Sequence, residues 1–328
     1  MKRKVIKQGH STLTITLPSK WVKKFDIKAG DELDLIEQKK SIVLNTQKVV
    51  DIGEISIDVS DLPTQLLWRF IISSYRAGYD KIKVTFENKG NDHKKLYTAF
   101  SYNTIEYLSN KKHLLKMSQI ETIQALVNRL IGMEIIDQKK NYCIIKEMGE
   151  ISYKEFDNSL RRIFLLIKDM SSQIQESFKG DKSNLKSVHI VDTNLDRFED
   201  FCLRVLNKKG YSDFNKTPIV FSTIFLLELI GDEYKDISIS LLSTRSESKE
   251  FIQALDNLID LFNKLYILFY KFDKEKVKEI YKNHEEWNLF NKKISPDLNA
   301  KEKEMIHHLK NINDYIKSLT ELKIDLET

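Results

Sequence analysis

Two segments in the second half of the chain carry pairs of carboxylates four residues apart. In the segment VDTNLDRFEDFCLRVL, Asp192 and Asp196 stand at positions i and i+4, and Glu199 extends the same stripe. In the segment ELIGD, Glu228 and Asp232 repeat this spacing inside a run of Leu, Ile and Phe. Residues four apart are neighbours on a helix, and like charges at this spacing destabilise it unless a cation lies between them.

The chemistry open to these carboxylates is the binding of a hard cation. An unpaired carboxylate in an apolar run is costly, and oxygen-rich sites suit magnesium, calcium, manganese or iron. Two such helices packed side by side would present four carboxylates to an ion. Paired acids also occur on solvated helix faces, so the residues alone leave both a metal site and an exposed acidic surface open.

A second group of candidate residues is the set of cations near the N-terminus. Residues 1–50 hold eleven Lys and Arg against five Asp and Glu, a net charge of +6, and the whole chain carries +5, so the remainder sums to −1. A basic segment of this kind can neutralise nucleic-acid phosphates and contact a groove. The candidate DNA-binding residues are Lys2, Arg3, Lys4, Lys7, Lys20, Lys23 and Lys24.

The elements that must position these cations are short strands and one short helix. The alternation over residues 13–17 predicts a half-buried strand, and Pro18 begins a helix that runs to Phe25. Residues 33–35 and 42–44 read as two further strands, joined by a turn at Lys39 and Lys40. About 45 residues with so few apolar side chains can hardly form a core alone. We therefore expect a homodimer in which strands of two copies interleave.

The run GHSTLTITLPSKWVKKFDIKAGDELDLIEQKKSIVL resembles the SpoVT/AbrB swapped-hairpin DNA-binding domain. A glycine, an alternating strand, a Pro-led short helix, a Gly-Asp turn and a final strand follow in that order. Asp26-Ile27 stands where the family usually has Gly-Ile or Gly-Leu. The resemblance implies that residues 1–48 bind DNA as a dimer, through the first strand and the short helix.

The remainder of the chain reads as a small α+β unit followed by helices. Residues 50–148 predict strands at 54–59 and 82–86, a helix from Pro63, helical stretches at 93–109 and 117–131, and a hairpin at 133–136 and 142–145. From residue 151 the apolar spacing is helical throughout. It predicts six helices, which form one bundle or two successive three-helix units: 151–178, 184–208, 218–242, 249–272, 274–291 and 298–325. The expected fold class is α+β, mostly α overall.

The helical half, residues 150–328, resembles the PhoU domain, which is built from two tandem three-helix repeats. Asp192-x-x-x-Asp196 is similar to the acid motif on the second helix of a repeat, and Glu228-Leu-Ile-Gly-Asp232 to that on the third, although Leu229 replaces the family's Arg. The second half of this region lacks both motifs. The resemblance implies a divalent or ferric ion (Mg, Mn, Fe or Zn) at the first repeat, with Asp192, Asp196, Glu199, Glu228 and Asp232 as ligands.

Composition limits the remaining possibilities. Cys143 and Cys202 form no CxxC pair, which favours reduced, buried thiols. No signal peptide follows the first residues, and apolar runs such as Ile219–Ile230 are shorter than the roughly 20 residues of a membrane span. These features predict a cytoplasmic protein without membrane insertion. Neither a nucleophile–base arrangement nor a cofactor loop is found, so we expect no enzymatic activity.

Together, the two family resemblances imply a DNA-binding transcriptional regulator of phosphate uptake, in which the helical bundle acts as a metal- or partner-dependent sensor. An alternative is a signalling adaptor that docks a phosphate transporter or a sensor kinase without binding DNA. A third is an antitoxin, since AbrB-like segments also occur in antitoxins. Antitoxins, however, usually carry a short disordered tail, and this tail is long and predicted to fold.

Overall fold

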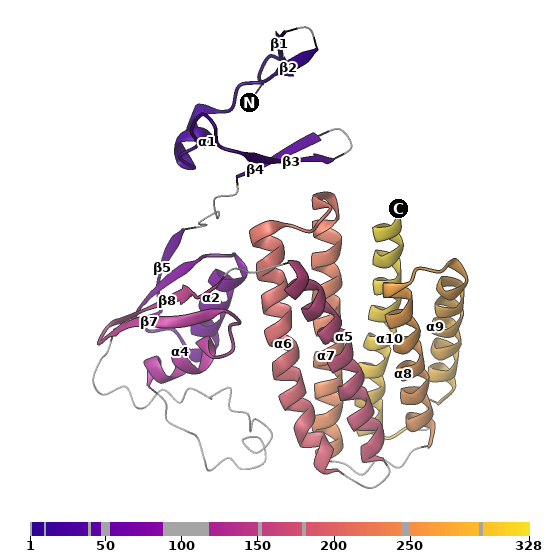
Figure 1. The fold of residues 1–328 in the computed structure, drawn as a ribbon. Helices are drawn as coiled ribbons and strands as arrows, with labels where there is room; N and C mark the ends of the chain where they lie inside the picture. Colours follow the sequence, from indigo (N-terminus) through magenta and orange to yellow (C-terminus); the bar gives the residue numbers. More distant parts are fainter. Residues whose placement is uncertain are drawn as a thin grey trace. The chain divides into compact units, whose positions relative to one another are not determined.

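The chain forms two compact units, Met1–Asp51 and Ile52–Thr328 (Figure 1). The computed structural model describes residues 2–9, 11–38, 41–46, 53–87, 118–149, 153–178, 182–243, 249–294 and 298–328. The expected turn at Lys39 and Lys40 and the expected helical stretch 93–109 lie outside the described residues.

The N-terminal unit consists of two strand pairs and a short helix. Strands β1 (Ile6–Gln8) and β2 (Thr12–Thr14) are antiparallel, and the turn between them includes Gly9 at φ 75°, a conformation that favours glycine. Helix α1 (Ser19–Lys24) begins after Pro18. Strands β3 (Leu33–Gln38) and β4 (Ser41–Thr46) form the second antiparallel pair. The elements follow the expected order, but β2 ends at Thr14 rather than at residue 17.

This unit has no interior of its own among the described residues, where every side chain of known burial is exposed or half-buried. Six of its large apolar side chains are 53–68% exposed: Val5, Ile6, Leu13, Ile15, Leu35 and Ile42. Fully burying one such side chain contributes roughly 1.5–3 kcal/mol. In a single copy these six side chains therefore contribute little of the stabilisation that their burial would give.

The second unit begins with an α+β part. Its four-stranded sheet has the order β5 (Glu54–Asp58), β6 (Lys81–Thr85), β8 (Tyr142–Glu147), β7 (Met133–Lys139), with β5 and β6 parallel and the other neighbours antiparallel. Helix α2 (Thr64–Arg76) connects the parallel strands, and α4 (Gln119–Val127) precedes β7. Leu67 and Ile71 of α2 pack into one core with Ile82 and Val84 of β6. Buried Cys143 belongs to the same core.

Six long helices make up the rest of this unit: α5 (Tyr153–Ser177), α6 (Ser183–Lys209), α7 (Thr217–Ser243), α8 (Lys249–Tyr270), α9 (Lys274–Ile294) and α10 (Ala300–Glu327). A short 3₁₀ turn, η1 (Phe214–Lys216), leads into α7. Helices α5–α7 pack together, as do α8–α10, and the two groups join where α7 meets α10 and α5 meets α8 (Figure 1). The predicted pair of three-helix units is confirmed, with helix ends within three residues of those expected.

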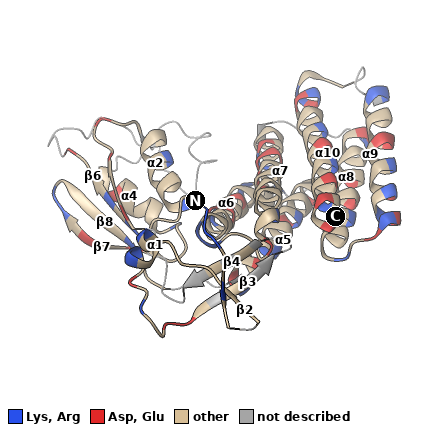
Figure 2. Ribbon diagram, turned by 90° about the horizontal axis from the view of Figure 1, so that it is seen from above, with Lys and Arg blue, Asp and Glu red and all other residues tan. Residues whose placement is uncertain are grey.

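Helix α7 is the most apolar of these helices. The segment Phe214–Leu242 is long and apolar enough to cross a membrane, with a mean hydropathy of 1.2, so the expectation that every apolar run is too short does not hold for this segment. In this structure α7 packs on α5, α6 and α10, but only 33% of its most apolar window is buried, and Phe221 and Phe225 are 37% and 46% exposed. In contrast, charges of both signs alternate along α9 (Figure 2).

Candidate nucleic-acid interface and acidic face

The candidate DNA-binding cations of the N-terminal unit are all exposed. Four of them precede or lie on β1, namely Lys2, Arg3, Lys4 and Lys7, and Lys20, Lys23 and Lys24 lie on α1 (Figure 2). Lys23 and Lys24 occupy the last turn of α1, where the helix dipole favours positive charge. Trp21 packs against Phe25 at a centroid distance of 5.7 Å, so the aromatic pair supports α1 from within the unit.

The five predicted metal ligands lie together on α6 and α7, and a sixth carboxylate, Asp200, lies beside them. We call these six residues the acidic face: Asp192, Asp196, Glu199 and Asp200 of α6, with Glu228 and Asp232 of α7. Three are buried, with Asp192 3%, Glu199 1% and Asp200 4% exposed. The acidic face is therefore not a solvated helix surface, which was one of the two interpretations that the sequence left open.

Cations from the α+β part neutralise the α6 carboxylates. Arg76, the last residue of α2, donates from Nη2 to Glu199 Oε2 and from Nε to Asp200 Oδ1, each at 2.5 Å. Arg129, which follows α4, donates from Nη2 to Asp196 Oδ2 at 2.8 Å. Arg76 lies 123 and 124 residues before its partners in the sequence, and Arg129 lies 67 residues before Asp196. The face thus connects two parts of the chain that no local pattern links.

Lys235 of α7 is a third cation at this face. Its Nζ lies 3.1 Å from Asp192 Oδ2 and also contacts Asp232, three residues earlier on the same helix. The guanidinium of Arg129 stacks over Trp68 of α2 at 4.9 Å, which fixes its orientation. Two arginines and one lysine therefore contact five of the six carboxyl groups of the acidic face.

The last two turns of α6 also contact the α+β part, but here the basic side chains lie on α6 and the acidic ones on the α+β part. Arg204 is fully buried and donates to the backbone oxygens of Tyr75 at 2.7 Å and Tyr79 at 3.0 Å, and to Glu147 Oε1 at 3.1 Å. Lys208 bridges Asp80 and Glu147. The carbonyls at the end of α2 carry partial negative charge, and the Tyr75 oxygen also accepts from the backbone N–H of Gly78 at 3.0 Å. Arg204 places a cation at this end of α2, so α6 presents acids to the arginines and bases to the acids of the α+β part.

Burial and crowding raise the proton affinity of the acidic face. Burial, followed by repulsion from Asp196, raises the pKa of Asp192 to about 7. Burial and the neighbouring Asp232 raise the pKa of Glu228 to about 8. Burial also raises the pKa of Glu199 and Asp200, and Arg76 opposes both shifts.

The acidic face, as arranged, fits guanidinium groups better than a metal ion. A hard divalent cation takes six or more oxygen ligands at about 2.0–2.6 Å. Among the described residues, no three His, Cys, Asp or Glu side chains lie close enough to share an ion. The α6 carboxylates are instead bonded to Arg76, Arg129 and Lys235. Sequence reasoning missed these cations, and only Lys235, three residues after Asp232, carried a local signal.

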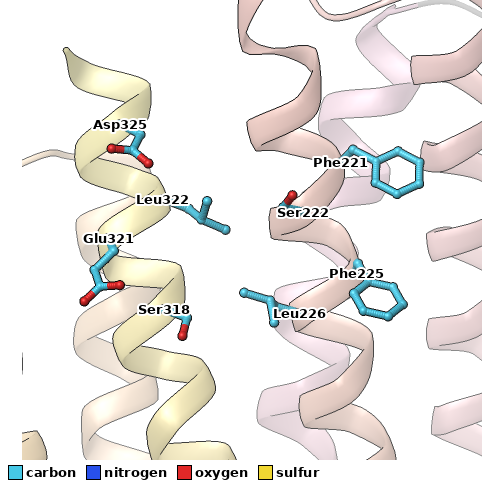
Figure 3. Close-up of a pocket in the computed structure, with 8 residues that line it drawn as sticks. All are labelled: Phe221, Ser222, Phe225, Leu226, Ser318, Glu321, Leu322 and Asp325. Carbon is cyan, nitrogen blue, oxygen red and sulfur yellow. The ribbon is translucent and has the colours of Figure 1, made fainter.

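A separate apolar groove lies between α7 and α10 (Figure 3). Its cavity volume is about 440 Å³, and it is lined by Phe221, Ser222, Phe225, Leu226, Ser318, Glu321, Leu322 and Asp325. Leu226 and Leu322 point toward one another across it, whereas the rings of Phe221 and Phe225 point away from α10 (Figure 3). None of the predicted DNA-binding or metal-binding residues lines this groove.

The fold defines a protein with a small basic β unit joined to an α+β part and a helical bundle, and comparisons with known proteins refine this description. Residues 6–51 match the family described as antidote-toxin recognition MazE, bacterial antitoxin. The N-terminal unit is therefore similar to swapped-hairpin DNA-binding domains of the MazE/AbrB type, as its sequence predicted. No curated protein sequence matches the chain.

A solved structure resembles the helical part. The phosphate transport system regulatory protein PhoU from Streptococcus pneumoniae is 19% identical, with a TM-score of 0.45, and the match covers 53% of this chain and 94% of that chain.

Proposed function

We propose that this protein is a DNA-binding transcriptional regulator that acts as a homodimer through its N-terminal unit. One observation carries the proposal: the unit exposes seven cations on β1, α1 and the residues before them, together with six large apolar side chains that a single copy leaves uncovered. A second copy would bury the apolar side chains and gather the cations of both copies on one assembly. Lysine on a strand-and-helix surface suits contacts to phosphates.

The regulated process that we propose is phosphate uptake, in the cytoplasm and without enzymatic activity. This part rests on the sequence resemblance of the two acid-bearing helices to the PhoU repeat, which also suggests transporter or sensor-kinase proteins as partners. Metal binding by the bundle stays a prediction from that resemblance, because the α6 carboxylates hold arginine and lysine side chains in this structure.

The lysines of α1 provide a direct test of DNA binding. The variant carries Lys20→Gln, Lys23→Gln and Lys24→Gln in the full chain. Each lost phosphate contact lowers the magnitude of the slope of log K against log salt by about 0.9, so three contacts lower it by about 2.7 if one copy contacts the DNA and six lower it by about 5.4 if both copies do. At about 0.1 M salt the same relation gives an affinity loss of about 500-fold for the three contacts of each copy. Fluorescence anisotropy of a labelled mixed-sequence duplex, measured over a series of salt concentrations, gives both quantities.

A matched control removes the same charge elsewhere. The exposed lysines Lys278, Lys282 and Lys301 lie on α9 and α10, with side chains 72%, 75% and 51% exposed. Their triple Gln variant has the same net charge as the α1 variant. We expect it to keep the wild-type slope. Equal slopes for wild type and the α1 variant would refute the assignment of α1 to the DNA interface.

An antitoxin is the second candidate, and the match of residues 6–51 to the MazE family favours it. In that case the helices after residue 151 would bind a toxin rather than sense phosphate. A signalling adaptor that does not bind DNA is the alternative to both. If wild-type protein shows no salt-dependent affinity for the duplex, the signalling adaptor replaces both the transcriptional regulator and the antitoxin as the proposed function.

A further inference from the structure

We propose that the acidic face is a docking surface for the chain's own arginines, and that arginine and a divalent cation are mutually exclusive occupants of it. In this arrangement Arg76 and Arg129 latch the α+β part onto α6. A metal ion reaches the carboxylates only when α2 and the turn after α4 move away from α6. The inference concerns the second unit and does not depend on DNA binding.

The geometry at Arg76 is specific for a guanidinium group. Two different nitrogens, Nη2 and Nε, each lie 2.5 Å from a carboxylate of the consecutive residues Glu199 and Asp200. A planar guanidinium presents its N–H groups in a fixed fork that suits this pair, whereas an ammonium group is a point charge. The carboxylate side chains are only 2% and 6% exposed and that of Arg76 25% exposed, so water competes little for the contact.

The exclusion of a metal follows from the oxygens that are already engaged. The carboxylates that Arg76 and Arg129 bind belong to three of the four acidic residues on α6. An ion that recruited several of these oxygens would displace the arginines and leave their charges without partners in a largely buried contact, which is costly. Metal binding through Asp196, Glu199 and Asp200 therefore requires separation of the arginines from α6. At the other end of the acidic face, Lys235 contacts Asp192 and Asp232 in the same way.

The rest of the interface fixes the position of the latch. Arg204 and Lys208, one and two turns further along α6, bind Glu147 of β8, and Asn207 Nδ2 donates to the backbone oxygen of Arg76 at 2.7 Å. This second contact has the reverse polarity: bases lie on α6 and the acid on the α+β part. Opposite polarities at the two ends of the contact oppose sliding of α2 along α6, because a shift would place like charges together.

Manganese titration of the full chain tests the exclusion. Free Mn²⁺, followed by its electron paramagnetic resonance signal, is measured against wild type, the double variant Arg76→Gln/Arg129→Gln, and the control Lys278→Gln/Lys282→Gln. The control loses the same charge at exposed positions of α9. We expect the arginine variant to bind Mn²⁺ at least about tenfold more tightly than wild type, because two competing cations are removed. The control should match wild type.

The single variant Arg129→Gln keeps the experiment interpretable if the double variant does not fold. Asp196, the partner of Arg129, is 30% exposed, so water can replace the lost bond. This variant should also bind Mn²⁺ more tightly than wild type. Unchanged Mn²⁺ affinity in a folded arginine variant would overturn the proposal.

Hydrogen exchange provides the second readout. If Arg76 and Arg129 hold the α+β part against α6, loss of their contacts should increase the mobility of the end of α2. Amide exchange at the C-terminus of α2 and at Ala77–Asp80 should accelerate in the arginine variants, and in wild type at Mn²⁺ concentrations that saturate it. Saturation of wild type with Mn²⁺ while these amides keep their full protection would show that both occupants coexist, and the exclusion would be wrong.

Discussion

Replacement of Arg204 by Gln should separate the unfolding of the α+β part from that of the bundle. The guanidinium is fully buried and is bonded to Glu147 and to the backbone oxygens of Tyr75 and Tyr79. Removing one partner of a buried ion pair costs about 3–5 kcal/mol, and a hydrogen bond that Gln retains returns about 1 kcal/mol. We therefore expect a loss of about 3 kcal/mol in the free energy of unfolding.

The tryptophans of the second unit report on its two parts separately. Trp68 is buried in the α+β core and Trp287 in the bundle core, at 5% and 2% exposure. In a background with Trp21→Phe, removal of one or the other leaves a single fluorescent reporter. If the free energy of unfolding falls by about 3 kcal/mol for each molar of urea, the loss of about 3 kcal/mol in the Arg204 variant lowers the urea midpoint by about 1 M. The Trp68 transition should move furthest, since Arg204 anchors the end of α2.

The control for this experiment is Arg161→Gln, which removes an exposed arginine from α5. It should leave both transitions within about 0.5 kcal/mol of wild type. A change below about 1 kcal/mol in the Arg204 variant, with coincident Trp68 and Trp287 transitions, would refute the view that this side chain holds the two parts together.

Three further substitutions test other contacts. His308 Nδ1 lies 2.5 Å from Glu233 Oε2, and this hydrogen bond raises the pKa of His308. The contribution of the hydrogen bond to stability, about 1–2 kcal/mol, is therefore full below pH about 6.5 and is lost as the pH rises through the raised pKa. Thermal melts of His308→Gln and of wild type should differ most near pH about 5.5 and converge at alkaline pH. Gly231→Ala should destabilise by about 1–3 kcal/mol in urea unfolding, because a Cβ atom there would meet Leu195 Cδ1 at 2.8 Å, where α6 and α7 pack closely. Leu35→Asp should abolish the dimer in sedimentation velocity, because Leu35 is 66% exposed in a single copy and burying two copies contributes about 3–6 kcal/mol.

These three predictions have their own controls and failures. Gly149→Ala introduces a Cβ atom with no neighbour within 4 Å and should leave stability unchanged. A pH-independent difference for the histidine variant would contradict the ion pair with Glu233. A dimer of unchanged affinity in the Leu35 variant would contradict burial of that side chain between copies.

Local sequence patterns were sufficient to predict the elements of this fold. Helical spacing of apolar residues located α5–α10 within three residues at each end, because this periodicity records which side of a helix is buried. Alternation and turn residues located the order of strands in the N-terminal unit, although β2 is shorter than expected. The acid pairs Asp192/Asp196 and Glu228/Asp232 were correctly placed on neighbouring helices, since i and i+4 spacing fixes a common face.

By itself, then, the sequence determined the basic N-terminal segment, the order of the elements and the gathering of five carboxylates on α6 and α7. Only the tertiary structure decided what neutralises them. Arg76 reaches Glu199 across 123 residues and Arg129 reaches Asp196 across 67, and the packing of α2 and α4 beside α6 brings each pair together. Periodicity is a property of one segment, whereas an ion pair between segments depends on how their surfaces meet. For that reason the same acids can read as a metal site in the sequence and form an arginine latch in the fold.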